Sequence, residues 1–167
     1  ALDIDREEVL IFDDWLVDPD TAQIDSNVAS SHAMSHAGRY GNYVTTNGIY
    51  NLALDAKRHE RLRLRLINAS NARIFPLRLE GLEGWIVALD GMPLAQPQPV
   101  SDVFTMAPAQ RVDLIVDVVA MEGETAHIAQ IDLHTGGFVL WVKEGGVIKA
   151  FFIVARQMFH LLASRPF

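Results

Sequence analysis

The sequence contains no cysteine. Disulfide bonds, thiolate metal ligands and a cysteine nucleophile are therefore excluded for this chain, and the redox compartment stays open. Long apolar runs are also missing, because no stretch reaches the roughly 18 to 20 residues that a membrane-spanning helix needs. The chain opens with Ala1-Leu2-Asp3, without an initiator methionine and without the cationic start of a signal peptide. We therefore expect an excised piece or a mature fragment of a longer protein.

Positive charge is scarce as well. The chain has 14 Lys and Arg against 21 Asp and Glu, which gives a net charge of -7 and a pI of about 5.2. This balance argues against nucleic acid and against an anionic membrane surface as partners. The 167 residues are the size of one domain, and 50% of them are hydrophobic, which is enough for a buried core.

A strict alternation of arginine and leucine runs from Arg61 to Asn68. Successive side chains of a β-strand point to opposite faces, so the three leucines would share one face and the three arginines the other. A helix would scatter the arginines around its axis and leave no apolar stripe. The period of two therefore predicts a half-buried strand, whose leucine face needs a second apolar layer.

Similar short strands are predicted along most of the chain, at a spacing of about 8 to 12 residues. Besides residues 61–68 they cover residues 7–15, 43–46, 51–54, 73–79, 85–89, 103–106, 111–118, 125–132 and 137–142. Residues 21–42 are expected to form a long polar loop with room for one helical turn. The pattern predicts an all-β sandwich or barrel with antiparallel connections.

The C-terminal segment of residues 147–167 differs in composition, because it is largely apolar and poor in charge. Its apolar spacing fits a helical stripe, whereas Phe151 to Val154 alone fit a strand. The segment is either an exposed interface or a cover that packs on the sandwich. We expect a domain over residues 1–146, followed by residues 147–167 as an apolar tail or linker.

Histidines are the first candidates for a metal site. None of the six is spaced as His-x-His. His32 and His36 are four residues apart, with Met34 between them, and on a helix they would share one face. The two histidines could bind a metal together or could be solvated side chains of a loop, and the sequence offers no third ligand nearby. We expect no catalytic residue, no bound cofactor and no metal in this chain, with His32 and His36 as weak metal candidates.

Charged residues on the predicted strands are candidates for structural contacts. Arg63 or Arg65 would face Asp113 or Asp117 across the sheet, either as a cross-strand charge pair or as a substrate or interdomain contact. Asp90-Gly91 fits a tight turn that needs positive φ. Structural roles are predicted for Arg65, Asn68, Asp90, Gly91, Arg111 and Asp113.

Five short motifs, in their order along the chain, resemble one family. They are Asp13-Asp14-Trp15, Thr46-Asn47-Gly48, Arg63 to Ser70, Val87 to Pro93 and Met106 to Val116. Over about residues 7 to 142 they resemble the middle cupredoxin domain of a three-domain, laccase-like bacterial multicopper oxidase. The resemblance implies a cupredoxin-like Greek-key β-sandwich or barrel, in agreement with the strand pattern.

That family oxidises a substrate at a type 1 copper and passes the electrons to a trinuclear copper cluster that reduces dioxygen to water. The resemblance places these coppers in the first and third domains. A type 1 site needs two histidines and a cysteine thiolate, which this chain cannot supply. The resemblance therefore implies a copper-free middle domain that spaces the copper-bearing domains and helps wall the substrate cleft. It also implies copper in the parent protein, flanking cupredoxin domains as partners, and a periplasmic or exported location.

Two alternatives remain at this point. The chain could be a cupredoxin-like protein-binding module that has lost copper, as in periplasmic cell-division factors, or a metal chaperone that uses His32 and His36. His-x-His pairs before residue 1 and a His-Cys-His cluster after residue 167 would favour the oxidase. We also expect the isolated domain to self-associate through surfaces that its neighbours cover.

Overall fold

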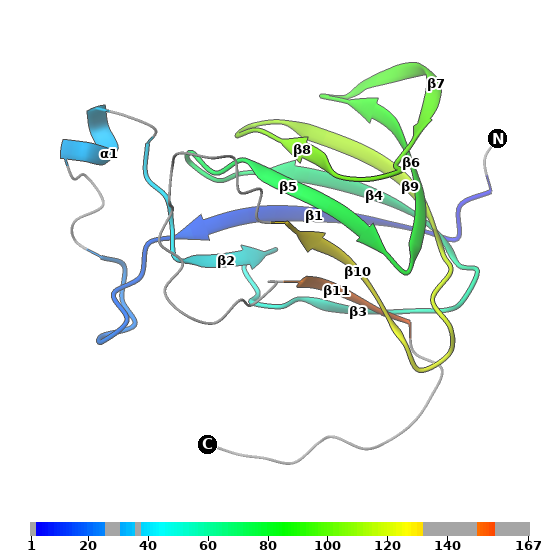
Figure 1. Ribbon diagram of the computed structural model, residues 1–167, viewed down its shortest axis with the longest axis horizontal. Helices are drawn as coiled ribbons and strands as arrows, with labels where there is room; N and C mark the ends of the chain where they lie inside the picture. The colour runs from blue at the N-terminus through cyan, green and yellow to red at the C-terminus, as the bar shows by residue number, and fades with distance from the viewer. Residues whose placement is uncertain (1–2, 26–30, 36–37, 132–149, 156–167) are drawn as a thin grey trace.

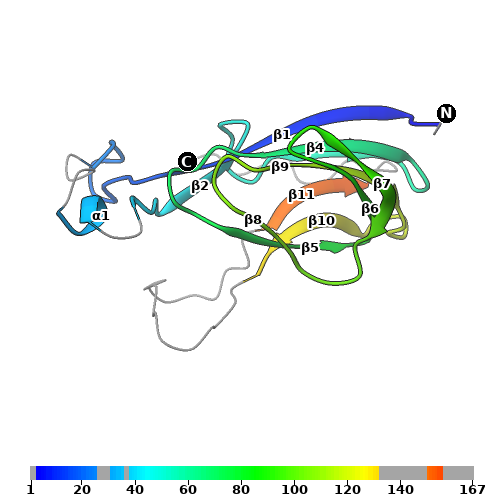
Figure 2. The same ribbon diagram turned by 90° about the horizontal axis from the view of Figure 1, so that it is seen from above.

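The computed structural model describes residues 3–25, 31–35, 38–131 and 150–155. Within these residues the chain forms eleven strands and one short helix (Figure 1). In chain order they are β1 (Arg6–Trp15), α1 (Ser31–Ser35), β2 (Tyr43–Thr46), β3 (Ala53–Ala56), β4 (Arg61–Asn68), β5 (Phe75–Glu80), β6 (Leu82–Leu89), β7 (Met92–Pro99), β8 (Phe104–Met106), β9 (Arg111–Val118), β10 (Thr125–Gln130) and β11 (Ala150–Ala155). Figure 2 shows the two layers, with β1, β4 and β9 on one side and β5 and β10 on the other. The predicted all-β sandwich is confirmed.

The arginine–leucine strand, β4, lies inside the larger sheet, whose strand order is β2-β1-β4-β9-β6-β7. Leu62, Leu64 and Leu66 have no exposed surface, because they point into the space between the layers. The arginines between them lie on the outer face and are partly exposed. Burial of each leucine contributes about 2 kcal/mol, so the alternation anchors this strand in one register.

The smaller sheet covers the leucine face, and its strand order is β3-β11-β10-β5-β8. Phe12 of β1 meets Phe75 of β5 across the layers, with ring centroids 5.7 Å apart and ring planes inclined by 53°. Met106 and Ile128 complete the same core. The second apolar layer that the leucine face requires is therefore supplied by this chain.

Neighbouring strands that follow one another, such as β1 and β2 or β6 and β7, are antiparallel as predicted, but two pairs of neighbours that are distant along the chain run parallel. β1 and β4 run parallel, from Arg6 opposite Leu62 to Phe12 opposite Asn68. β11 and β3 also run parallel. Parallel neighbours need a crossover connection, and both pairs are separated by other strands along the chain. The sequence showed where strands lie but not which of them become neighbours.

Residues 150–155 form β11, which lies between β10 and β3 in the smaller sheet. The strand alternative for this part of the apolar segment is confirmed, and these residues belong to the sandwich. The strand predicted over residues 137–142 and the boundary predicted at residue 146 lie outside the described residues. The division into residues 1–146 and 147–167 stays a prediction.

Residues 16–42 connect β1 to β2, and we refer to this stretch as the excursion. The helical turn expected there is α1, which lies away from both sheets in Figure 1. Among the described helices of the chain, none is long and apolar enough to cross a membrane.

Candidate functional site

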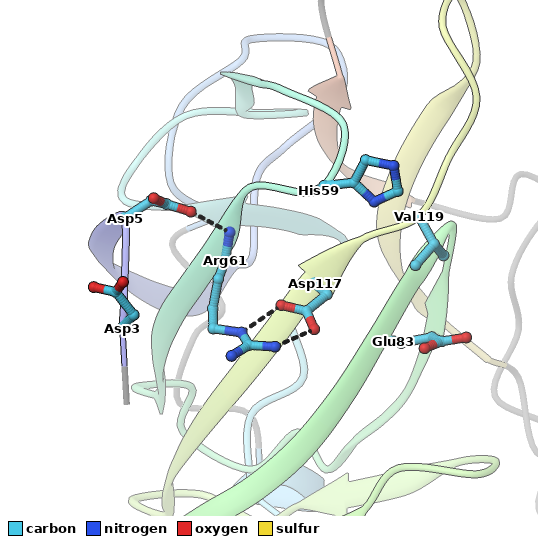
Figure 3. Close-up of a pocket in the computed structure, with 7 residues that line it drawn as sticks. All are labelled: Asp3, Asp5, His59, Arg61, Glu83, Asp117 and Val119. Carbon is cyan, nitrogen blue, oxygen red and sulfur yellow. Dashed lines mark hydrogen bonds and ion pairs between the residues drawn. The ribbon is translucent and has the colours of Figure 1, made fainter. Parts of the chain in front are cut away.

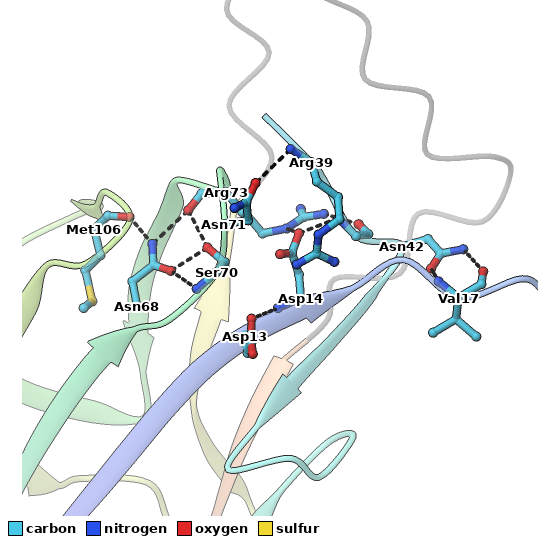
Figure 4. Close-up of polar contacts among 11 residues, drawn as sticks. Asp13, Asp14, Val17, Arg39, Asn42, Asn68, Ser70, Asn71, Arg73 and Met106 are labelled. Atoms are coloured by element: carbon cyan, nitrogen blue, oxygen red, sulfur yellow. Dashed lines mark hydrogen bonds and ion pairs between the residues drawn. The ribbon is translucent and has the colours of Figure 1, made fainter. Parts of the chain in front are cut away.

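Asn68, the last residue of β4, is a fully buried asparagine that joins three segments of chain. Its side-chain nitrogen donates to the backbone carbonyls of Arg73 and Met106, at 2.8 and 2.9 Å. Its side-chain oxygen accepts from the backbone N–H and the hydroxyl of Ser70, at 3.0 and 2.5 Å (Figure 4). Both donors and both acceptor positions of the amide are used. These contacts support the structural role that we predicted for Asn68.

A buried ion pair lies at the same end of the sandwich. Asp14 has no exposed surface, and its Oδ2 accepts from Arg73 Nε at 3.0 Å and from the N–H of Gly41 at 2.6 Å (Figure 4). Arg73 also donates to the Gly41 carbonyl at 2.5 Å, and its guanidinium lies 5.6 Å from the centre of the Tyr40 ring. A side chain at Gly41 would come within 2.5 Å of the backbone nitrogen of Trp15, so only glycine allows this approach.

The sequence reading did not find this ion pair, because its two members are 59 residues apart. One signal was present. Leu10 and Phe12 are buried at alternate positions of β1, and the same period of two continues to Asp14. A carboxylate on the buried face of a strand requires a partner, which the period could have indicated.

The two ends of the excursion are held together beside the ion pair. The Asn42 side chain accepts from the N–H of Val17 at 2.9 Å and donates to the carbonyl of Val17 at 2.7 Å. The backbone N–H of Asn42 donates to the carbonyl of Trp15 at 3.0 Å, and that of Arg39 donates to Asn71 Oδ1, also at 3.0 Å. The polar contacts in Figure 4 therefore fix where the excursion leaves and rejoins the sandwich.

The outer face of the larger sheet carries a ladder of charge pairs that crosses β1, β4 and β9. The register sets Arg65 opposite Asp113 and Arg61 opposite Asp117. Arg63 reaches Asp113 at 2.7 Å, while Arg65 lies 3.9 Å from Asp113 and 3.1 Å from Glu7 of β1. The predicted pairing of these arginines with acids across the sheet is present, and the partial exposure of the arginines makes each pair a weak contributor to stability.

Arg61 and Asp117 form a bidentate ion pair within this ladder. Arg61 Nε and Nη2 donate to the two Asp117 oxygens at 2.6 and 2.7 Å. These hydrogen bonds, together with the positive charge of the guanidinium, hold the pKa of Asp117 below its usual value. The same contacts raise the pKa of Arg61.

Arg111 lies on the outer face but bonds to a turn instead of joining the ladder. Asp90 and Gly91 both have positive φ, at 50° and 83°, as the Asp-Gly motif predicts. Arg111 donates its backbone N–H to Asp90 Oδ1 and its Nη2 to the Asp90 carbonyl, both at 2.8 Å. Arg111 thus ties the β6–β7 turn to β9, which supports structural roles for these three residues.

An open hollow lies at one end of the larger sheet, where the ends of β4, β9 and β6 are close to the N-terminal residues (Figure 3). It is lined by Asp3, Asp5, His59, Arg61, Glu83, Asp117 and Val119. Asp117 is bonded to the Arg61 guanidinium, and Asp5 Oδ2 accepts the backbone N–H of Arg61 at 2.7 Å. Two of the hollow's acids therefore hold the chain together, and the arrangement suggests no proton-transfer or metal chemistry.

The donor set does not fit a redox copper. Within the part of the chain that the structure describes, no group of three or more His, Cys, Asp or Glu side chains could hold a metal ion. His127 Nε2 lies 2.6 Å from Glu80 Oε2, and the cysteine that a type 1 copper requires is missing from the whole sequence. His32 lies in α1, and His36 lies outside the described residues, so a metal pair there stays a hypothesis.

The family model described as "Multicopper oxidase" matches residues 6–131, which include ten of the eleven strands. The chain belongs to the multicopper oxidase family. The resemblance to this family found in the five motifs is confirmed, and the chain is a cupredoxin domain of the family, while its middle position stays a prediction.

Individual relatives agree with the family match. Multicopper oxidase mco of Staphylococcus haemolyticus is 35% identical over 96 residues, which are 57% of this chain and 21% of that protein. Cell division protein FtsP of Photorhabdus laumondii is 33% identical over 101 residues, which are 56% of this chain and 21% of that protein. The crystal structure of a multicopper oxidase from Pseudomonas thermotolerans superposes with a TM-score of 0.66 at 29% identity, covering 75% of this chain and 30% of that one. The chain thus spans about a fifth of the curated relatives that it matches.

Proposed function

We propose that this chain is the copper-free middle domain of a multicopper oxidase, which spaces the copper-bearing domains and helps wall the substrate cleft. The observation that carries the proposal is a match to the multicopper oxidase family over residues 6–131 in a chain that has no cysteine and no His-x-His pair. A domain of this family that cannot ligate a type 1 copper has to act through its shape and its contacts.

The geometry supports a rigid spacer. Asn68 fastens the β4–β5 connection to the end of the sandwich. The Asp14–Arg73 pair holds Gly41, near the C-terminal end of the excursion, at the same place. The described ends of the excursion lie beside this rigid scaffold, and long connections at such a place commonly build binding walls. In this proposal copper, oxygen reduction, the flanking cupredoxin domains and a periplasmic or exported location are properties of the parent protein.

The test starts from the complete reading frame around residues 1–167. We expect it to encode His-x-His pairs before residue 1 and a His-Cys-His cluster after residue 167. The purified full-length protein should contain copper and consume dioxygen when a phenol or an aromatic amine is supplied. A reading frame without these clusters, or a full-length protein without copper, would contradict the proposal.

A second candidate function is a protein-binding module that has lost copper, and it is favoured by the similarity to cell division protein FtsP. In that case the complete protein binds neither copper nor a phenolic substrate. The discriminating measurement is the copper content of the full-length protein after reconstitution with copper. The metal-chaperone alternative is tested on the 167-residue chain by titration calorimetry with Cu(I), Cu(II) and Zn(II), where binding no tighter than about micromolar would remove it.

A further inference from the structure

Five large apolar side chains lie together at the β1–β2 edge of the larger sheet. We refer to them as the apolar strip, which consists of Val9, Ile11, Trp15, Tyr43 and Tyr50. Each of the five is between 40% and 43% exposed. Scattered exposed apolar residues are ordinary, but a group of this size gathered on one face marks a contact surface.

Strand register places the strip on one face of the sheet. Val9, Ile11, Asp13 and Trp15 occupy alternate positions of β1 on its outer face, so the partly buried Asp13 lies between Ile11 and Trp15. Trp15 lies opposite Tyr43 of β2, and the Tyr43 ring stacks on Tyr50, with centroids 5.0 Å apart and planes inclined by 17°. The aromatic end and the aliphatic end therefore lie on the same face of the sheet, on either side of Asp13.

The aromatic end of the strip is held in place before any partner arrives. Trp15 Nε1 donates to Thr45 Oγ1 at 3.2 Å, so the indole is oriented along the sheet. The stacked tyrosine rings restrict each other in the same way. Rigid, half-exposed aromatic side chains lose little conformational entropy on association, which makes them effective anchors of a protein interface.

The arginines beside the strip are already paired with acids of the chain, and Asp13 within it accepts the backbone N–H of Asp14 at 2.8 Å. Arg65 lies 3.1 Å from Glu7, and Arg63 lies 2.7 Å from Asp113. A polyanion would have to compete with these acids for the guanidinium groups. An apolar centre beside a polar border of paired charges is instead the anatomy of a protein–protein contact.

We propose that the apolar strip is the surface on which a neighbouring cupredoxin domain of the same polypeptide packs. The proposal rests on the proposed function, and it assigns the interdomain contact to the outer face of β1 and β2. The matched relatives are several times longer than the region that they share with this chain, so a protein of their plan has further chain to cover the strip. The hollow in Figure 3 contains none of the strip residues, which separates the two surfaces.

Hydroxyl-radical footprinting with peptide mass spectrometry tests this assignment. The 167-residue chain, at a dilution where it is monomeric, is compared with the full-length protein. We expect oxidation of Trp15, Tyr43 and Tyr50 to fall by about fivefold or more in the full-length protein, because an interface core excludes water. Met92 and Met121, which are 72% and 52% exposed and lie outside the strip, are the internal controls and should change little.

Equal oxidation of the strip in both proteins would overturn the proposal. Protection already present in the monomeric 167-residue chain would also overturn it, because the cover would then belong to this chain. Protection that appears only at concentrations where the full-length protein dimerises would assign the strip to a second copy instead. The copper content of the same sample reports on the proposed function separately, so a failure of either one is recognised independently.

Discussion

At the scale of single residues, the end of the sandwich depends on two buried polar side chains, Asn68 and Asp14. The Asn68 amide uses all of its hydrogen-bonding capacity on three chain segments. The Asp14 carboxylate is fully buried and forms an ion pair with the guanidinium of Arg73. Removal of Arg73 from the Asp14–Arg73 ion pair leaves an uncompensated buried charge, and this costs far more free energy than the pair contributes.

Replacing Arg73 tests this point. We expect Arg73→Met to lower the free energy of unfolding by about 3 kcal/mol or more, because Asp14 then keeps its burial and loses its counter-charge. Arg73→Lys should recover part of the loss. The matched control is Arg65→Met on the exposed ladder, which should cost less than about 1 kcal/mol. Urea unfolding followed by circular dichroism measures all three, and equal losses at positions 73 and 65 would contradict the expectation.

The Arg61–Asp117 pair predicts a dependence of stability on pH. The folded state holds the pKa of Asp117 below its usual value, because Arg61 donates two hydrogen bonds to the carboxylate. The pair therefore stabilises the fold above the unfolded pKa of about 3.9, and this contribution is lost as the pH falls from there through the folded pKa. We expect Asp117→Asn to unfold at lower urea than the unmodified chain at pH 7.

The urea midpoints of Asp117→Asn and of the unmodified chain should converge as the pH falls below about 4. The double variant Arg61→Met/Asp117→Asn is the control, and at pH 7 it should be little less stable than Asp117→Asn alone, because one partner is already neutral. A difference between Asp117→Asn and the unmodified chain that stays constant down to pH 2 would show that the charge of Asp117 is not the cause.

At the scale of elements, β2 is too short to cover the edge of β1, and one side chain completes the pairing. β2 pairs with β1 only from Phe12 to Trp15. Beyond that point the Asn47 side chain accepts from the N–H of Ile11 at 2.8 Å and donates to the carbonyl of Val9 at 2.9 Å. Asn47 also has positive φ, at 52°, so it serves both the turn and the strand edge.

Substitutions of Asn47 separate these two roles. Asn47→Gly keeps the turn geometry and loses both side-chain bonds, and we expect it to cost about 1 to 2 kcal/mol. Asn47→Ala should cost more, because alanine also disfavours positive φ. Amide exchange of Ile11 measured by NMR should accelerate in both variants, while that of Leu64 within β4 follows global stability. An unchanged Ile11 exchange rate would show that the amide does not protect this edge.

How far the sequence predicts these elements depends on the range of the interactions that form them. The Arg–Leu alternation and the Asn47-Gly48 and Asp90-Gly91 turns are local patterns, and the structure confirms the strand and both turns. The parallel neighbours of β1 and of β3 and the Asp14–Arg73 pair join distant segments, and no local pattern specifies such contacts. The structural roles predicted for Arg65 and Asp113 now have contacts that support them, while the part of His32 and His36 stays a hypothesis.

At the scale of the whole molecule, the larger sheet carries two different surfaces, the hollow of Figure 3 and the apolar strip. The hollow is polar and bonded internally, whereas the apolar strip exposes aromatic and aliphatic side chains. A domain that exposes a rigid apolar surface is expected to bury it against whatever protein surface is available. For the 167-residue chain alone, we expect that surface to belong to another copy of the chain.

We therefore expect the 167-residue chain to dimerise at concentrations of about 10 to 100 μM, in a range typical of weak interfaces. The variant Trp15→Ser/Tyr43→Ser should shift the equilibrium at least about tenfold towards monomer, because two of the three aromatic anchors are removed. The control variant Met92→Ser/Met121→Ser removes two more exposed side chains outside the strip and should dimerise like the unmodified chain. Sedimentation velocity measures all three, and a strict monomer at about 1 mM would rule out self-association.

Asn68 has a practical consequence for production of the protein. Asn68-Ala69-Ser70 has the letters of an acceptor for N-linked sugar, yet in the folded protein the amide is enclosed and fully bonded. In a eukaryotic secretory pathway the sugar is transferred while the chain is still emerging, before that enclosure exists. A glycan there would block closure of the sandwich end, so secretion from yeast should yield glycosylated, misfolded material where a bacterial host yields folded protein.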